Sequence, residues 1–376
     1  MYDPECEGEI AMNYTTEREQ LWKRIEGADK FYIYGAQIVA YGVYKAISEV
    51  LGKYPKAFLV SSKVNNPTEI DSIPVSLVSG EINTDALIIV ATPEIYHDEI
   101  KEILENYKLN NLLFVDSHVE YLIMSKYFQK LGTFKLLEDL PFYKSSDELP
   151  GVKMFMAKHH RDKRLKGQYD IPSWVIPIQV GASLTDLRIT ELLDNTGDNI
   201  SNKNYKYSEL TAMYWAWKNI REEYLGICHY RRILLLDTED LIKIKQNNIN
   251  VVLPLPFVCY PDASGQYGRY ISAEDQEKLM EVLKETDPEY YRAALKILKG
   301  PYLYNYNMFL ADSETFNEYC NWIFPVLKRA EELCEPSGQE RTDRYLGYFA
   351  EVLTALYFLY NKNNLKIVHG EKKWMV

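Results

Sequence analysis

Short apolar runs and amphipathic helical segments alternate through about the first 125 residues, and this alternation limits the chain to few folds. Residues 38–52 carry an apolar side chain at every fourth position and end in Gly52, which predicts an amphipathic helix and its C-terminus. Strands that are apolar throughout and separated by helices are typical of a parallel sheet covered on both faces. The sequence therefore predicts an α/β protein with an N-terminal Rossmann-like, parallel-sheet domain. The predicted strands are residues 30–35, 56–62, 86–93 and 111–118, and a predicted helix covers residues 94–107.

The turn after the first predicted strand departs from the dinucleotide-binding pattern. Gly35 is present, but Gln37 and Ala40 occupy the positions of the second and third glycines, which allow close approach of a pyrophosphate and tight packing of the helix. The second strand ends in residues 61–63, Ser-Ser-Lys, without an acid for a ribose diol. A structural or sugar-nucleotide-sensing role is therefore favoured for this domain, and an NAD- or S-adenosylmethionine-dependent enzyme remains an alternative.

A chain of 376 residues is long for one core and suits two. A helical segment at residues 119–131 is followed by a polar stretch at 143–151, after which the sequence pattern changes. We therefore predict domains at 1–150 and 151–376. In the second domain, apolar strands at 152–160 and 174–182 lead to a long Asn/Asp/Gly-rich loop and a helix.

Composition excludes several classes of protein. With 43 basic and 54 acidic side chains the net charge is −11, which argues against a protein that binds nucleic acid by neutralising phosphates. The five cysteines form no CxxC pair and favour reduced thiols. No apolar run approaches the ~18–20 residues that span a bilayer, and the acidic N-terminus lacks an apolar signal segment. We expect a cytoplasmic protein, with peripheral contact to a membrane surface as its only membrane association. The 31 tyrosines can line a polar ligand groove such as a sugar site, although most are expected at core margins.

Residues 192–220 join a polar loop to an amphipathic helix. Ser208 is the expected helix cap and Glu209 lies in the expected first turn. Exposed N–H groups and the macrodipole at a helix N-terminus favour an anion such as a diphosphate, while a turn-rich loop without a ligand is the alternative. The polar side chains of the loop include Asp194, Asp198, Asn199 and Asn204.

The predicted strand at 224–230 ends in the tetrapeptide His-Tyr-Arg-Arg. Because alternate side chains on a strand share a face, Arg231 is expected beside His229, and Arg232 beside Tyr230. Arginine's planar fork suits bidentate phosphate binding, and the alternative is a solvated edge.

Three segments carry a resemblance to a known family. Residues 176–189 (IPIQVGASLTDLRI), 194–219 (DNTGDNISNKNYKYSELTAMYWAWKN) and 224–232 (YLGICHYRR) resemble signature blocks of a bacterial glycosyltransferase-like family, long catalogued as a domain of unknown function. The family occurs in capsular and exopolysaccharide clusters, and some members are assigned as galactofuranosyltransferases. The resemblance spans roughly residues 152–359 and implies a GT-A-like domain, a UDP-sugar donor and a growing, including lipid-linked, glycan as acceptor.

GT-A enzymes usually end a central strand in a DxD motif that holds Mg²⁺ or Mn²⁺, whereas His-Tyr-Arg-Arg stands at a comparable place here. Our hypothesis is that His229 and the arginines neutralise the donor diphosphate, so that no cofactor is required. Mn²⁺ or Mg²⁺ bound by acids at 237–240 is the alternative. The predicted donor-binding residues are Asn199, Asn204, Glu209, His229, Arg231 and Arg232.

An inverting transferase also needs a base for the acceptor hydroxyl. Glu351 matches a recurrent acid of the family, and its apolar helix would raise its pKa. Asp194 and Asp198 are rivals for this role, and packing of Glu351 against Arg341 or Arg344 is the structural alternative.

Residues 302–312 are predicted to form one strand whose two faces could contact an acceptor. Tyrosines 302, 304 and 306 share one face and Asn305 and Asn307 the other, and burial of one face in the core is the alternative. The predicted acceptor-binding residues are Tyr304, Asn305 and Asn307. The basic run 158–166 is expected near donor phosphate, at an anionic membrane surface, or as a solvated loop.

These patterns and the resemblance together predict a glycosyltransferase that moves a hexose, galactofuranose as the first hypothesis, from UDP to a capsular, exopolysaccharide or O-antigen glycan. A non-catalytic module that binds sugar nucleotides is the alternative from another class. The sequence leaves inversion against retention open.

Overall fold

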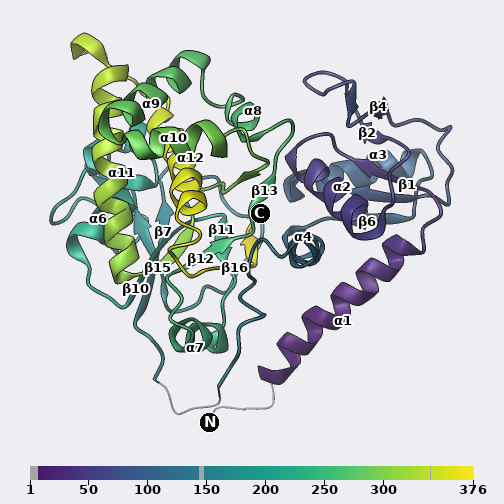
Figure 1. Ribbon diagram of the computed structural model, residues 1–376, viewed down its shortest axis with the longest axis horizontal. Coiled ribbons are helices and arrows are strands. Elements are labelled where there is room, and N and C mark those ends of the chain that lie inside the picture. Colours follow the sequence, from purple (N-terminus) through teal and green to yellow (C-terminus); the bar gives the residue numbers. More distant parts are fainter. Residues whose placement is uncertain (1–6, 144–147, 339) are drawn as a thin grey trace. The chain divides into compact units, whose positions relative to one another are not determined.

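The computed structural model describes residues 7–143, 148–338 and 340–376 (Figure 1), with side chains from residue 14 onward except at position 337. The chain divides into two compact units. The first holds Met1–Glu138 with Phe257–Cys259 and Val376, and the second holds Asp139–Pro256 and Tyr260–Met375.

The first unit contains one sheet and its helices. The helices are α1 (Glu7–Glu26), α2 (Ile38–Leu51), η1 (Glu94–Tyr96), α3 (His97–Asn106) and α4 (Ser117–Leu131). The strands are β1 (Phe31–Tyr34), β2 (Phe58–Val60), β3 (Glu69–Ile70), β4 (Ile73–Leu77), β5 (Leu87–Val90), β6 (Leu112–Phe114) and the short β13 (Phe257–Val258).

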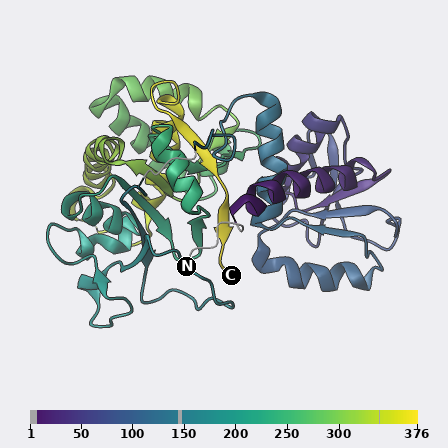
Figure 2. The same ribbon diagram turned by 90° about the horizontal axis from the view of Figure 1, so that it is seen from below.

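This sheet has the order β3-β4-β2-β1-β5-β6, in which β4, β2, β1, β5 and β6 are parallel and β3 is antiparallel. α2 ends at Gly52, whose left-handed φ of 66° closes the helix as the sequence predicted. Because β2 and β6 lie on opposite sides of the β1–β5 pair, right-handed crossovers place α2 and α3 on opposite faces (Figure 2). The predicted parallel-sheet α/β architecture is confirmed, while β3 and β4 were not predicted.

The second unit carries a larger sheet and more helices. Its helices are η2 (Ala182–Leu184), η3 (Ser201–Lys203), α5 (Asn204–Tyr207), α6 (Leu210–Asn219), α7 (Thr238–Gln246), α8 (Ala263–Tyr267), α9 (Ala273–Thr286), α10 (Pro288–Ile297), α11 (Ser313–Cys334), η4 (Pro336–Gly338) and α12 (Tyr345–Tyr360). Its strands are β7 (Val152–Lys158), β8 (Val175–Gln179), β9 (Leu192–Leu193), β10 (Tyr224–His229), β11 (Arg232–Leu234), β12 (Val251–Pro254), β14 (Tyr302–Leu303), β15 (Phe309–Asp312), β16 (Ile367–Gly370) and β17 (Lys372–Trp374).

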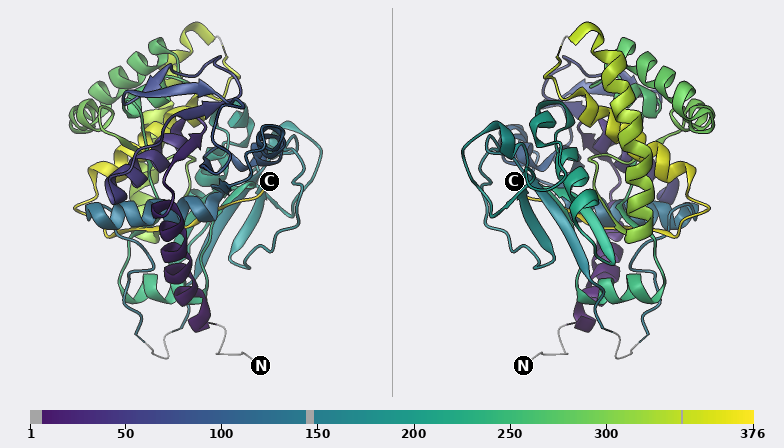
Figure 3. Two further views of the ribbon diagram at one scale, coloured as in Figure 1. Left: turned by 90° about the vertical axis from the view of Figure 1, so that its right-hand side faces the viewer. Right: turned by 90° about the vertical axis from the view of Figure 1, so that its left-hand side faces the viewer.

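The second sheet runs β16-β12-β15-β10-β7-β8-β9, with β10, β7, β8 and β9 parallel and β15 antiparallel to both neighbours. α6 packs on β7 and β10, and the long helix α11 packs on β10, β15 and α6 (Figure 3). Phe309 of β15 contacts the rings of Tyr319 and Phe358, so aromatic packing joins the sheet to α11 and α12. The parallel strands bring the residues that follow β7, β8 and β10 to the same sheet edge.

Two local predictions were wrong. Residues 302–312 do not form one strand, because Tyr306 and Asn307 adopt positive φ angles of 84° and 43° and separate β14 from β15. The alternation of tyrosines and asparagines therefore does not define two faces. Ser208 was predicted to cap the helix that is now α6. It has φ 54°, and Glu209 is the N-cap of α6 instead.

Candidate functional site

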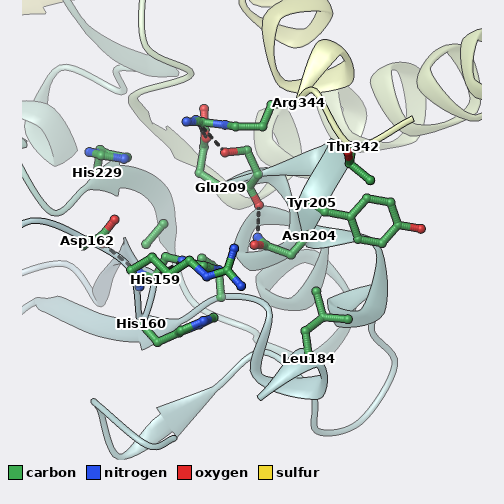
Figure 4. Close-up of a pocket in the computed structure, with 14 residues that line it drawn as sticks. His159, His160, Asp162, Leu184, Asn204, Tyr205, Glu209, His229, Thr342 and Arg344 are labelled. Atoms are coloured by element: carbon green, nitrogen blue, oxygen red, sulfur yellow. Dashed lines mark hydrogen bonds and ion pairs between the residues drawn. The ribbon is translucent and has the colours of Figure 1, made fainter. Parts of the chain in front are cut away.

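A pocket of about 460 Å³ lies at the carboxyl ends of β7 and β10, where ligands bind in open α/β sheets. We call it the His229 pocket. Figure 4 shows His229 and Asp162 on one side of it, Asn204 and Tyr205 on the other, and Arg344 above Glu209. Its lining side chains include His159, His160, Arg161, Asp162, Leu184, Asn204, Tyr205, Ser208, Glu209, His229, Thr342 and Arg344.

A tight turn at the end of β7 forms one wall. The Asp162 carboxylate accepts the backbone N–H of His159 at 2.7 Å, and the backbone N–H of Asp162 donates to the His159 carbonyl at 2.9 Å. Burial raises the pKa of Asp162 to about 6, against the opposing effects of Arg231 and other cations. Burial and the neighbouring His160 lower the pKa of His159. Sequence reasoning noted the basic run but did not assign His159, His160 or Asp162 to a site.

Asp194 organises the opposite wall without reaching the pocket. Its carboxylate is fully buried and accepts hydrogen bonds from four donors, which saturates its lone pairs. These donors are the backbone N–H groups of Gly181 and Ala182 and the hydroxyl groups of Ser201 and Thr211. Asp194 therefore ties the turn after β8 to η3 and α6. Gly181 permits this turn, because its φ is +66° and a Cβ would meet Asn204 Oδ1 at 2.9 Å.

Glu209 is the carboxylate that the fold presents to the pocket beside His229. Its Oε1 accepts the side-chain N–H of Asn307 at 2.9 Å, and its Oε2 lies 3.8 Å from the guanidinium of Arg344. Asn307 is buried and also donates to the Gly347 carbonyl and accepts the Thr354 hydroxyl. Asn307 lies between β14 and β15, and its bonds to two residues of α12 fix its amide in place. The amide thus holds Oε1 of Glu209 and leaves Oε2 available to a ligand.

His229 and Glu209 differ in charge at neutral pH. Burial lowers the pKa of His229 to about 4, assisted by Arg232, Arg344 and Arg231 and opposed by Glu209. Burial opposes ionisation of Glu209, but His229, the Asn307 amide and Arg344 outweigh it and lower the pKa of Glu209. At neutral pH Glu209 is therefore ionised and His229 is a neutral imidazole. Within the described part of the chain, the buried Nδ1 of His229 has no hydrogen-bond partner.

The two arginines after His229 lie differently from the prediction. β10 pairs antiparallel with β11 in the register His229 to Arg232, so Tyr230 and Arg231 form a two-residue turn. Arg232, and not Arg231, therefore shares the face of His229. Its guanidinium lies 3.9 Å from the ring centroid of Tyr306 and 4.2 Å from that of Trp374. The chain reverses direction at this turn, and the alternation of side chains along a strand did not predict the reversal.

Glu351 lies in the apolar helix α12, as predicted, but it does not line the His229 pocket. Burial raises the pKa of Glu351 to about 8, with Glu209 adding to the effect and Arg232 and Arg344 opposing it. Arg341 pairs with Asp275 and Asp343, so the predicted structural partners of Glu351 are engaged elsewhere or act at longer range.

The other predicted residues are dispersed. Asn204 lines the pocket and donates to the Ser208 carbonyl at 2.7 Å. Asp198 is exposed and bonds Asn219 and Tyr214, and Asn199 bonds within its own loop, so neither joins the pocket. Tyr304 is buried against His369 at 2.8 Å, and Asn305 is half-buried outside the pocket lining.

Sequence reasoning considered Arg344 only as a partner for Glu351. In the structure Arg344 donates to the Ser208 hydroxyl at 2.8 Å and lies beside Glu209 in the pocket lining. The sequence gives little indication that Arg344 lies beside Glu209, because the two residues are about 135 positions apart and only tertiary packing brings them together.

Two searches of the described residues gave negative results. No group of three or more His, Cys, Asp or Glu side chains in residues 7–143, 148–338 and 340–376 is arranged to hold a metal ion. Over the same ranges, the helices are too short or too polar to cross a bilayer.

Comparison with known proteins places the site in a family. Residues 153–363 match the family described as "Domain of unknown function (DUF4422)", a segment that includes every residue lining the His229 pocket. None of the curated proteins matches the chain. The chain is similar to a solved structure titled "WbbM bifunctional glycosytransferase apo structure", with a TM-score of 0.52 and 26% identity over 60% of this chain. The match covers 45% of that protein, so this chain corresponds to less than half of it. Because the family match spans more than half of its length, the chain belongs to the DUF4422 family.

Proposed function

We propose that the chain is a glycosyltransferase that moves a hexose from a nucleotide diphosphate sugar to a glycan acceptor. The observation that carries this proposal is the likeness to part of a bifunctional glycosyltransferase at 26% identity. The His229 pocket supports it, because its lining residues fall within the family segment and at the ligand-binding edge of a parallel sheet. Galactofuranose, UDP and a capsular, exopolysaccharide or O-antigen glycan, including a lipid-linked one, are the finer hypotheses within this proposal. We likewise propose a Rossmann-like first domain and a GT-A-like second domain.

In this proposal Glu209 is the general base. Its ionised Oε2 accepts the proton of the acceptor hydroxyl as that oxygen forms a bond to the anomeric carbon. The bond from the anomeric carbon to the phosphate oxygen breaks, and the nucleoside diphosphate leaves with the electron pair. Asn307 and Arg344 are positioning residues, because each holds one oxygen of the Glu209 carboxylate. Glu351 remains the alternative base suggested by the sequence.

We propose that protein cations neutralise the leaving diphosphate and that no metal is required. His229 contributes no positive charge to this task at neutral pH, because its pKa is lowered to about 4. The charge therefore falls on arginine and lysine side chains near the pocket. The alternative is Mn²⁺ or Mg²⁺ bound near Asp237 and Asp240.

The test is acceptor-dependent release of nucleoside diphosphate from a panel of UDP-hexoses, measured on the full chain in EDTA and in Mn²⁺. We expect release in EDTA and its loss in Glu209→Gln. Strict dependence on Mn²⁺ would contradict the cationic mechanism but not the transferase. Binding of UDP-sugars without transfer to any acceptor would favour the non-catalytic module, and binding of NAD or S-adenosylmethionine instead would favour an enzyme of the first domain.

A further inference from the structure

A second cavity, of about 900 Å³, adjoins the His229 pocket within the same unit. We call it the basic-loop cavity. His159, His160 and Asp162 line both cavities, so the turn after β7 is a shared wall. The lining continues from this turn through the loop of residues 163–169. A ligand that fills both cavities therefore passes along one fixed turn.

The charge of the basic-loop cavity is opposite to that of the protein. Lys158, Lys163, Arg164 and Lys166 line it, and Asp162 is the single carboxylate among its described lining residues. The whole chain has a net charge of −11. Over the described ranges, none of these four cations forms an ion pair with a carboxylate of the chain. Such a concentration of unpaired cations in an acidic protein favours an anionic ligand.

Part of the cavity lining is apolar and aromatic, and we call this part the floor. It includes Met156, Ile171, Pro177 and Ile189, together with the rings of Tyr169 and Tyr230. A loop that merely carried solvated charge would not need such a floor, because solvated lysines extend into water. An apolar surface beside cations instead fits a ligand in which an anionic group is attached to a flat or apolar group.

The shared wall is held in place before any ligand binds. The backbone N–H of Arg161 donates to His159 Nδ1 at 3.1 Å, which adds to the two bonds between His159 and Asp162. The rings of His159 and His160 lie 4.1 Å apart, and the buried Nδ1 of His160 has no partner in the described structure.

We propose that the basic-loop cavity binds a diphosphate ester, with Lys163 and Arg164 on the phosphates and the apolar floor against the esterified group. Arginine can hold two phosphate oxygens at once, and lysine adds a point charge. This proposal rests on the proposed function, since a transferase meets diphosphate esters in two forms. One is the nucleoside diphosphate of the donor, and the other is the lipid diphosphate of an acceptor. Both share the same anionic chemistry.

The test uses calorimetry on the full chain with UDP, uridine and farnesyl diphosphate. The test variant is Lys163→Gln/Arg164→Gln, and both side chains are exposed, so folding is expected to be unchanged. The matched control is Arg292→Gln/Lys296→Gln, which removes the same two charges from the exposed side of α10. We expect the test variant to bind a diphosphate at least about tenfold more weakly, the control to match wild type, and uridine to bind weakly to all three.

The two diphosphates distinguish the source of the ligand. A loss confined to UDP assigns the cavity to the donor, and a loss confined to farnesyl diphosphate assigns it to a lipid-linked acceptor; either supports the site. Equal affinity of wild type and test variant for both diphosphates overturns it, as does an equal loss in the control. Wild-type transfer together with unchanged diphosphate binding in the test variant would refute this cavity and leave the transferase standing. Diphosphate binding that needs Lys163 and Arg164, without transfer to any acceptor, would do the reverse.

Discussion

The parallel sheets of the two units carry their cavities at opposite edges. In the first unit, a cavity of about 490 Å³ is lined by Asp29, Lys30 and Leu87, at the amino ends of β1 and β5. In the second unit, the His229 pocket lies at the carboxyl ends of β7 and β10. Ligands of open α/β sheets bind at carboxyl ends, so the His229 pocket of the second unit lies at the expected edge, and the cavity of the first unit does not.

Polar side chains at the carboxyl edge of the first unit are hydrogen-bonded to neighbouring groups of the same unit. Gln37 donates to the Asn65 carbonyl and to Asn66 Oδ1, and the Glu94 carboxylate accepts the backbone N–H of Ser117 at the start of α4. Glu209 of the second unit keeps one carboxylate oxygen toward a pocket. Parallel strands in the two units are thus followed by residues with different roles. Function must therefore be argued from the residues at the carboxyl ends of the strands, and not from the order of strands and helices.

Replacement of a carboxylate at each edge gives the largest expected contrast. Glu209→Gln should lower the transfer rate by about a thousandfold, because it removes the base and keeps the hydrogen bond from Asn307. Glu94→Gln should leave the rate unchanged, since its amide oxygen can still accept from Ser117. Acceptor-dependent UDP release measures both. Full activity of Glu209→Gln would move the base to another residue, and a comparable loss in Glu94→Gln would assign chemistry to the first unit.

Asp194 and Asp198 provide a contrast within a single loop. Asp194→Asn should lower the free energy of unfolding by about 3 kcal/mol, because an amide cannot accept from all four donors and turns an N–H group toward them. Asp198→Asn, at an exposed position of the same loop, should change it by less than about 0.5 kcal/mol. Urea unfolding measures both. A stable Asp194→Asn protein without activity would restore Asp194 as the base.

Features that depend on residues close together in the sequence were predicted, and features that depend on contacts between distant residues were not. Apolar periodicity predicted β1, β7, β10 and the end of α2 at Gly52, because these depend on neighbouring residues. It did not predict the two-residue turn at Arg231, since pairing of β10 with β11 decides that reversal. The polar loop was identified, but its carboxylates could not be ranked. Burial and four donors make Asp194 structural, whereas contacts from Asn307 and Arg344, far along the chain, present Glu209 to the pocket.

Glu351 gives a pH-dependent prediction of smaller size. Its pKa is raised from 4.5 to about 8 in the folded protein, mainly by burial, so the folded state favours the protonated carboxyl. Its contribution to stability is full below about pH 4.5 and is lost as the pH rises through 8. Glu351→Gln should therefore match wild type near pH 4.5 and exceed it by about 2 kcal/mol near pH 9.

Urea unfolding from pH 4.5 to 9 tests this expectation, with Glu281→Gln on the exposed side of α9 as the control. Parallel pH curves for wild type and Glu351→Gln would show that Glu351 is not buried with a raised pKa. Loss of transfer in Glu351→Gln, with Glu209→Gln active, would make Glu351 the base that the sequence suggested.

Arg232→Lys and Arg231→Lys give the smallest and most specific contrast, at the turn that the sequence did not predict. Lysine keeps the charge of Arg232 but not the planar guanidinium that contacts the rings of Tyr306 and Trp374, so stability should fall by about 1 kcal/mol. Arg231 lies in the turn and should tolerate lysine. Because both variants keep their positive charge, the pKa of His229, followed by NMR, should stay well below its usual range. If Arg232→Lys instead weakens UDP binding about tenfold at unchanged stability, the guanidinium contacts the diphosphate. The cations that bind the diphosphate would then include Arg232 of β11 as well as the loop after β7.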